Sequence, residues 1–219
     1  MLPGDGIGVE VTKVSLDILE ILGKKHGARF EFETELFGGS SIDAHGVPVT
    51  AEVLEKAKAS DAVLMGAVGG PKWENLEHSK KPESGLLAIR KELDAFANLR
   101  PAVVYPALAD ASTLKRDVVE GTDIMVVREL TGGIYFGSPR GVDRISDSEE
   151  KGYNTMVYTT HEIERIARVA FDIARKRKNR VTSIDKANVL DVMQLWRTVV
   201  TNVRQKEYPD VELEHLYVD

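Results

Sequence analysis

The sequence predicts an α/β fold in two lobes. Segments with helical and with strand periodicity alternate along the 219 residues. Two glycine-rich turns, at residues 2–8 and 66–73, adjoin apolar segments, and loops at strand ends are the usual binding positions of α/β folds. No internal repeat or low-complexity linker interrupts the pattern, and we expect the seam between the lobes at residues 96–101.

Composition excludes several protein classes. The absence of cysteine excludes a disulfide scaffold. A net charge of −6, from 29 Lys and Arg against 35 Asp and Glu, argues against nucleic acid as a principal partner. No apolar run approaches the roughly 18 residues that cross a membrane, and the first residues lack the features of a signal peptide. We therefore expect a cytoplasmic enzyme that binds neither membrane nor nucleic acid.

The first half of the chain begins with an amphipathic helix. Apolar residues at helical spacing predict this helix over 11–22. Residues 29–36 alternate apolar or small with charged side chains, which predicts a half-exposed strand. The remaining elements of this half are, in order, a helix at 51–59, a buried strand at 62–65, a loop at 69–83 and a helix at 85–93.

In the second half, a capping box is the clearest signal. Thr159 and Glu162 have its spacing and predict the start of an amphipathic helix. The other expected elements are strands near 102–105 and 124–127, a glycine-marked hairpin at 131–137, an exposed arm or loop at 138–159, a buried strand at 181–184 and a long helix at 189–203. The sequence opens directly on a glycine turn and stops on a strand-like segment, so we expect a fragment that is incomplete at both ends.

The two glycine turns are weak signals when taken singly. The turn at 2–8 opens a helix, where backbone N–H groups can meet an anion. Val9, however, occupies the place of the third glycine of the dinucleotide fingerprint, and a tight turn explains these glycines equally well. In the second turn, Trp73 either contributes to a binding loop or packs that loop onto the core.

The helix after this loop can present a substrate-binding face. Leu86 and Leu87 follow Glu83 by three and four residues, and Arg90 follows them by four and three, so one helix face can present all four side chains. The combination suits a ligand with a carboxylate beside an aliphatic branch. The alternative is an ordinary amphipathic helix with core leucines and a solvated arginine.

Other charged residues stand where chemistry is common. Arg100 precedes Pro101, and Arg128 ends an apolar strand. Guanidinium groups bind carboxylates with two hydrogen bonds. The alternative for each arginine taken singly is an ordinary ion-pair partner. Lys186 lies between a buried strand and a helix and is a candidate general base; the alternative is a solvated lysine at a helix start. Asp219 could be a lone metal carboxylate.

Six motifs, in their order and spacing, together resemble the metal-dependent β-decarboxylating dehydrogenases, the isocitrate/isopropylmalate dehydrogenase family. They are residues 2–8 (LPGDGIG), 69–73 (GGPKW), 83–90 (ESGLLAIR), 97–101 (ANLRP), 127–137 (VRELTGGIYFG) and 185–190 (DKANVL). The joint pattern is much more specific than any one motif.

The resemblance implies the two-lobed fold of that family. Residues 1–95 would form the first half of a large cofactor-side domain, and residues 96–219 a second domain with a dimerisation arm and interface helices. The implied reaction is the oxidative decarboxylation of (2R,3S)-3-isopropylmalate to 4-methyl-2-oxopentanoate, in leucine biosynthesis. It would take place in a homodimer that uses NAD and either Mg²⁺ or Mn²⁺.

The resemblance also gives each site residue a role. Arg90, Arg100 and Arg128 would hold the substrate carboxylates. Leu86 and Leu87, with the partner subunit's Val189, would line the isopropyl pocket. Lys186 would take the proton of the 2-hydroxyl group, Tyr135 would protonate the enolate, and Asp219 would bind the metal. Lys186 and Asn188 would reach across the dimer interface. The implied cofactor-binding residues are Ile7, Gly69, Gly70, Pro71, Lys72, Trp73 and Glu83.

Two alternative functions remain open. One is a sister enzyme acting on isocitrate, malate or tartrate; isocitrate enzymes carry a small hydroxyl residue and asparagine where Leu86 and Leu87 stand. The other is a non-catalytic truncated remnant, because the sequence lacks the family's remaining metal aspartates and adenosine-binding loop. We expect the fragment by itself to be inactive. Val9, where the family usually has proline, is a departure that we expect to be tolerated.

Overall fold

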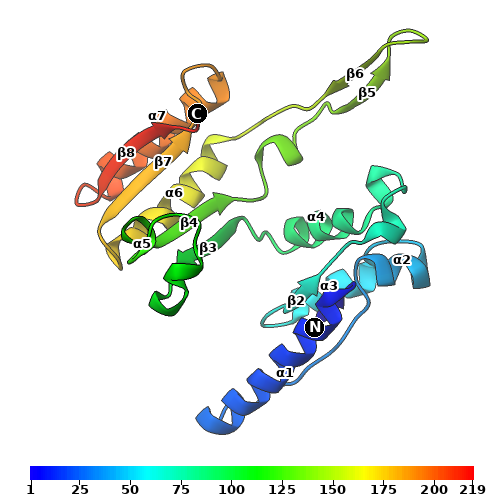
Figure 1. The fold of residues 1–219 in the computed structure, drawn as a ribbon. Helices are drawn as coiled ribbons and strands as arrows, with labels where there is room; N and C mark the ends of the chain where they lie inside the picture. Colours follow the sequence, from blue (N-terminus) through cyan, green and yellow to red (C-terminus); the bar gives the residue numbers. More distant parts are fainter. The chain divides into compact units, whose positions relative to one another are not determined.

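The computed structural model describes all residues from Met1 to Asp219, and the chain divides into two compact units (Figure 1). The first unit is Met1–Asp94 and the second is Ala95–Asp219. Each unit has a hydrophobic cluster of its own.

The first unit is built on a short parallel pair of strands. β1 (Leu2–Gly4) and β2 (Met65–Ala67) pair Leu2 with Met65 and Gly4 with Ala67. Its helices are α1 (Ile7–His26), α2 (Gly39–His45), α3 (Ala51–Ala59) and α4 (Pro82–Glu92), with 3₁₀ helices at Pro71–Trp73 and His78–Lys80. The core of this unit consists of Leu2, Phe37, Val53, Ala57 and Ile89.

Local signals explain where these helices begin and end. α3 starts after Thr50, whose hydroxyl accepts a hydrogen bond of 3.3 Å from the backbone N–H of Val53. α1 ends at Gly27, whose left-handed backbone (φ 67°) returns its N–H to the Gly23 carbonyl. The expected helices at 11–22, 51–59 and 85–93 are therefore confirmed, with α1 and α4 longer than expected.

Two strand predictions in this unit need correction. Residues 29–36 do not form a strand: the only backbone partner near them is Met1, which bonds to Glu33 and Glu35 (2.7 and 3.0 Å). Two hydrogen bonds are too few for a β-ladder. Whether a segment forms a strand depends more on pairing with a neighbouring strand than on the alternation of its own apolar and charged side chains. The strand expected at 62–65 is found further along the chain, at Met65–Ala67, where it pairs with β1. It therefore includes the first residues of the glycine-rich turn.

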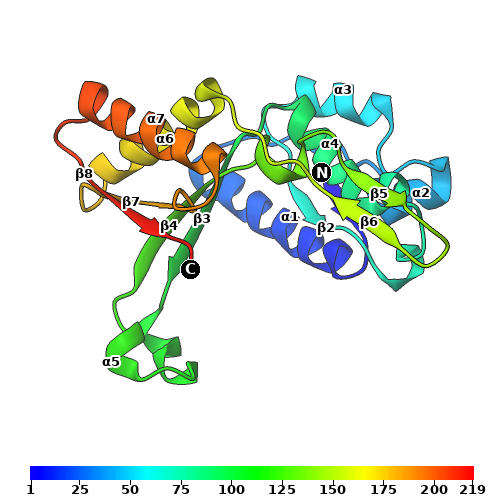
Figure 2. The ribbon, with the colours of Figure 1, turned by 90° about the horizontal axis from the view of Figure 1, so that it is seen from above.

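The second unit has three strand pairs, of which two lie beside its helices. β3 (Ala97–Val103) and β4 (Asp123–Glu129) are antiparallel, and β7 (Arg180–Asp185) and β8 (Glu212–Tyr217) are parallel. α6 (Thr160–Arg175) and α7 (Asp191–Glu207) lie side by side against β7 and β8 (Figures 1 and 2). Between β3 and β4 are a 3₁₀ helix (Pro106–Ala111) and α5 (Arg116–Val119). Most of the core comes from α6 and α7, including Ile163, Phe171 and Val200.

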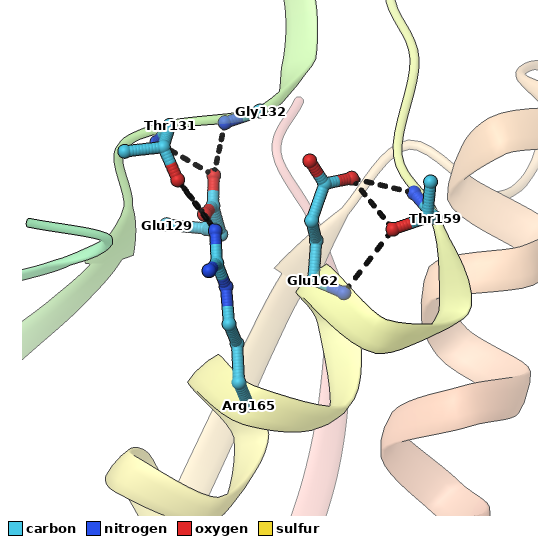
Figure 3. Close-up of polar contacts among 6 residues, drawn as sticks. All are labelled: Glu129, Thr131, Gly132, Thr159, Glu162 and Arg165. Atoms are coloured by element: carbon cyan, nitrogen blue, oxygen red, sulfur yellow. Dashed lines mark hydrogen bonds and ion pairs between the residues drawn. The ribbon is translucent and has the colours of Figure 1, made fainter. Parts of the chain in front are cut away.

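The capping box at the start of α6 is confirmed. The Thr159 hydroxyl accepts from the Glu162 N–H (3.3 Å), and the Glu162 carboxylate accepts from the Thr159 N–H (2.7 Å; Figure 3). The predicted helix at 189–203 begins two residues later, at Asp191, so that Val189 stays outside it and is exposed.

The segment 131–137 is not a hairpin but holds a 3₁₀ helix at Gly133–Tyr135. Its first amides bond elsewhere: those of Thr131 and Gly132 to the Glu129 carboxylate, and that of Gly133 to the Val157 carbonyl. These bonds take the first three N–H groups of the segment away from a cross-strand ladder. Residues 138–159 do form an exposed arm, a small antiparallel hairpin of β5 (Gly141–Arg144) and β6 (Glu150–Tyr153).

No helix in the chain combines the length and the apolar character that crossing a membrane requires.

Candidate functional site

Asp5 ties together the glycine-rich segments of the first unit. Its carboxylate is buried and accepts backbone hydrogen bonds of 2.8 Å from Gly39, Ser40 and Gly69. Its own N–H donates to the Ala67 carbonyl (2.7 Å). The sequence analysis quoted this residue but assigned it no role. The available signal was an acidic side chain between two glycines at the start of a helix.

Gly69 brings the loop after β2 close to α4. Its φ of +98° is one that side chains other than glycine rarely adopt. A Cβ at this position would lie 2.8 Å from the Glu83 carboxylate. Two of the expected cofactor-binding residues therefore lie together.

The loop from Gly70 to Glu83 encloses a pocket of about 330 Å³. It is lined by Gly70, Trp73, Glu74, His78, Lys81, Pro82 and Glu83. Lys72 and Trp73 anchor the loop to α2, because both donate to Asp43 (2.6 and 3.2 Å). The Lys72 hydrogen bond, together with that of Trp73, holds the pKa of Asp43 below its usual value.

The lining of this pocket is chemically mixed. It offers an aromatic ring, a carboxylate and glycine backbone, a mixture typical of small-molecule sites. Gly70, Trp73 and Glu83 are expected cofactor residues that line it, and Pro71 and Lys72 belong to the same 3₁₀ helix. Ile7 is exposed at the first position of α1.

α4 presents a face that the core does not use. Its core side carries Ile89, which is 3% exposed. Leu86, Leu87 and Arg90 are only partly buried, and neither leucine belongs to the hydrophobic cluster. Within this chain, the two leucines therefore lie outside the hydrophobic cluster to which Ile89 belongs.

In the second unit, the β3–β4 ladder brings two arginines to one face. Asn98 pairs with Arg128, and Arg100 pairs with Val126. Since cross-strand partners and next-but-one residues share a face, Arg100 and Arg128 are diagonal neighbours on it. The Arg128 guanidinium lies 5.4 Å from the centre of the Tyr135 ring. Arg90, the third expected carboxylate ligand, belongs to the first unit.

Lys186 and Asp219 lie at the adjacent ends of β7 and β8. Lys186 Nζ is 2.7 Å from Asp219 Oδ2, and this hydrogen bond lowers the pKa of Asp219. Asn188 and Val189, which the sequence analysis grouped with Lys186, are exposed in the turn that follows. The structure thus pairs the expected base with the expected metal ligand.

The residues of this chain do not by themselves assemble a metal centre. No group of three or more His, Cys, Asp or Glu side chains could hold an ion. Asp219 is a single carboxylate, whereas Mg²⁺ needs several oxygen ligands.

Asp185 holds the turn that carries Lys186. Its buried carboxylate accepts two hydrogen bonds of 2.9 Å from Arg197 and one from the Ala187 N–H. Burial alone would raise the pKa of Asp185, but Arg197 and the Ala187 N–H outweigh it, and the pKa is lowered. The sequence analysis missed this role, because Arg197 lies one helix further along the chain.

Comparisons with known proteins find similarity over the whole length of the chain. The model of the isocitrate/isopropylmalate dehydrogenase family matches residues 1–219. Curated proteins named 3-isopropylmalate dehydrogenase are 62% identical over 218 residues in Chlorobium chlorochromatii and 59% identical over 219 residues in Paramagnetospirillum magneticum. Each match covers 100% of this chain but 60% and 59% of the relative, so the chain spans about 60% of the length of these relatives.

Solved structures show the same fold. An isocitrate dehydrogenase from Methylococcus capsulatus matches with a TM-score of 0.83 at 27% identity, over 100% of this chain and 59% of that one. A β-decarboxylating dehydrogenase from Thermococcus kodakarensis matches with a TM-score of 0.70 at 31% identity, over 100% and 57%. With the family match over all residues, these likenesses show that the chain belongs to the isocitrate/isopropylmalate dehydrogenase family.

Proposed function

We propose that the chain is part of an enzyme that oxidises and decarboxylates (2R,3S)-3-isopropylmalate to 4-methyl-2-oxopentanoate, with reduction of NAD. One observation carries this proposal: curated 3-isopropylmalate dehydrogenases are 55–62% identical to the chain over its whole length. The reaction belongs to leucine biosynthesis, and we place it in the cytoplasm as part of the same proposal.

The proposed substrate site combines cationic and apolar groups. Arg100 and Arg128, adjacent on one face of the β3–β4 ladder, would bind the substrate carboxylates together with Arg90. Leu86 and Leu87 would contact the isopropyl group, with the partner subunit's Val189 closing the pocket. Support for the apolar role is that both leucines lie on α4 outside the core.

Two residues of the chain would move protons. Lys186, whose Nζ lies 2.7 Å from Asp219 Oδ2, would take the proton of the 2-hydroxyl group. Tyr135 would protonate C3 of the enolate after CO₂ has left, beside the positive charge of Arg128. When bound, NAD supplies the hydride acceptor, and its nicotinamide side would contact Ile7, residues 69–73 and Glu83. Asp219 is the one carboxylate of the proposed site that could bind Mg²⁺ or Mn²⁺.

An isocitrate, malate or tartrate substrate is the nearest alternative. Two adjacent leucines on the α4 face favour the isopropyl group over the extra carboxylate of isocitrate. A non-catalytic remnant is less favoured, since Tyr135 and Lys186 are both present.

The test is a comparison of substrates. The complete protein of which the chain is part is purified and given NAD, Mg²⁺ and one of four substrates: 3-isopropylmalate, isocitrate, malate or tartrate. NADH formation is then followed. We expect the highest kcat/KM with 3-isopropylmalate. The Lys186→Ala variant should lose most of kcat while it unfolds at a normal temperature, and Lys178→Ala, an exposed lysine, serves as its control. A preference for isocitrate, or normal turnover by Lys186→Ala, would contradict the proposal.

A further inference from the structure

Glu129 is a buried carboxylate between the strand of Arg128 and the loop of Tyr135. It is the last residue of β4, and its side chain is only 1% exposed. Because neighbours along a strand face opposite sides, Glu129 faces away from the ladder face that carries Arg128. The proposed reaction gives this residue no role.

Four donors converge on this carboxylate (Figure 3). Oε2 accepts from the backbone N–H groups of Thr131 (3.0 Å) and Gly132 (2.7 Å). Oε1 accepts from the Thr131 hydroxyl (3.0 Å) and from Arg165 Nη2 (3.2 Å), and Arg165 Nη2 also donates to that hydroxyl (2.5 Å). The first turn of the loop is therefore bound to Glu129 by both backbone and side chain.

Arg165 connects this turn to α6. Its guanidinium lies 4.4 Å from the centre of the Phe96 ring. The Phe96 carbonyl in turn accepts a hydrogen bond of 2.8 Å from Leu130. The Glu129–Arg165 ion pair thus joins α6, the start of β3 and the end of β4.

The next residues of the loop are equally constrained. Gly133 donates to the Val157 carbonyl (2.8 Å), and a Cβ on Gly132 would lie 3.0 Å from the Tyr158 ring. Tyr135 follows at the end of the 3₁₀ helix and reaches the Arg128 guanidinium. Tyr135 therefore follows directly on a backbone that is bonded in place from Thr131 to Gly133.

We propose that Glu129 and Arg165 are positioning residues, which hold the 131–137 loop so that Tyr135 stays beside Arg128. The consequence for catalysis rests on the proposed function above. Arg128 itself is held by its ladder partner Asn98. Loss of the ion pair should therefore displace Tyr135 more than Arg128, and should lower kcat much more than it raises the KM for 3-isopropylmalate.

The test compares Glu129→Gln and Arg165→Met in the complete protein. The glutamine oxygen can still accept hydrogen bonds from the N–H groups of Thr131 and Gly132. The amide NH₂ group, however, then faces the Arg165 guanidinium and cannot form an ion pair with it. We expect kcat to fall on the order of tenfold, with KM changed less than about twofold. The amides of residues 130–137 should exchange hydrogen for deuterium about tenfold faster. Because both changes break one pair, the double variant should lose little more than either single variant.

The matched control is Glu162→Ala, which removes the side-chain acceptor of the capping box one turn earlier on α6 (Figure 3). It should lower the melting temperature but leave kcat and the exchange of residues 130–137 nearly unchanged. The proposal is overturned if Glu129→Gln and Arg165→Met lower kcat no more than this control, or if their loop amides exchange at the wild-type rate.

Two further outcomes are also decisive. If Glu129→Gln does not fold, Arg165→Lys takes its place, because it keeps the positive charge but loses the planar guanidinium. Its kcat should also fall, but by less than that of Arg165→Met. A wild-type kcat in Arg165→Lys would overturn the proposal. If the wild type does not oxidise 3-isopropylmalate, the proposed function fails. Hydrogen exchange in the variants still decides whether the pair holds the loop.

Discussion

Three buried carboxylates hold the backbone segments on which the expected site residues lie. Asp5, Glu129 and Asp185 are each less than 10% exposed. Their backbone donors are the N–H groups of Gly39, Ser40 and Gly69 for Asp5, of Thr131 and Gly132 for Glu129, and of Ala187 for Asp185. A buried charge is stable only with such partners, so these residues support the geometry of the loops rather than the chemistry.

The first prediction concerns Asp5. In Asp5→Asn one acceptor oxygen becomes an NH₂ group that faces backbone donors, so we expect the free energy of unfolding to fall by about 2–3 kcal/mol. Urea unfolding of the wild type and the variant measures this loss. Asp43→Asn, which removes an exposed carboxylate with two side-chain partners, should cost much less. Equal losses in the two variants would show that burial of Asp5 is unimportant.

The second prediction concerns pH and His215. Its side chain faces Thr201, Asp185 and Arg197; burial and the charge of Arg197 lower its pKa, and Asp185 only partly offsets them. The folded chain therefore binds this proton more weakly than the unfolded chain, whose histidine has a pKa of about 6.5. The stabilisation is complete above that pH and is lost as the pH falls from it through the lower pKa of the folded chain.

Urea unfolding at a series of pH values checks this prediction. The midpoint should fall as the pH is lowered from about 7 to about 5. His215→Gln should remove part of that dependence, and His161→Gln, on an exposed position of α6, should leave it unchanged. A wild-type slope in His215→Gln would contradict the assignment.

At the scale of elements, the sequence predicts those that carry their own local signals. α3 starts at its Thr50 cap and α6 at its capping box, where hydrogen bonds within four residues decide the boundary. The errors at 29–36 and 131–137 have the opposite origin. There the outcome depends on distant partners, Met1 in one case and Val157 in the other, and alternation or glycine spacing does not reveal them.

The third prediction belongs to the exposed face of α4. Changing Leu86 and Leu87 to serine removes apolar contact with the isopropyl group, and should reduce the preference for 3-isopropylmalate over malate by about 1–3 kcal/mol in kcat/KM. Steady-state kinetics with both substrates measure this ratio. Ile89→Val, on the core side of the same helix, should lower stability but keep the ratio. Equal losses for both substrates would exclude a pocket on this face.

At the scale of the whole molecule, the expected site is distributed over both units. Leu86, Leu87 and Arg90 lie in Met1–Asp94, whereas Arg128 and Lys186 lie in Ala95–Asp219. That these residues act together is part of the proposed function, which rests on the likeness of the chain to one family. Spacing carries no information about which subunit supplies each group, and a homodimer with shared sites remains a proposal.

Subunit mixing tests that proposal. If Lys186 acts in the site of the partner subunit, Lys186→Ala and Arg90→Met damage different halves of each site. A mixed dimer then has one site with both changes and one with neither. Because random assembly makes half of the dimers mixed, an equal mixture that has been unfolded and refolded together should recover about a quarter of wild-type activity. Each variant refolded alone, at the same total concentration, should stay inactive. Activity no higher than the sum of those controls would mean that each chain uses its own Lys186.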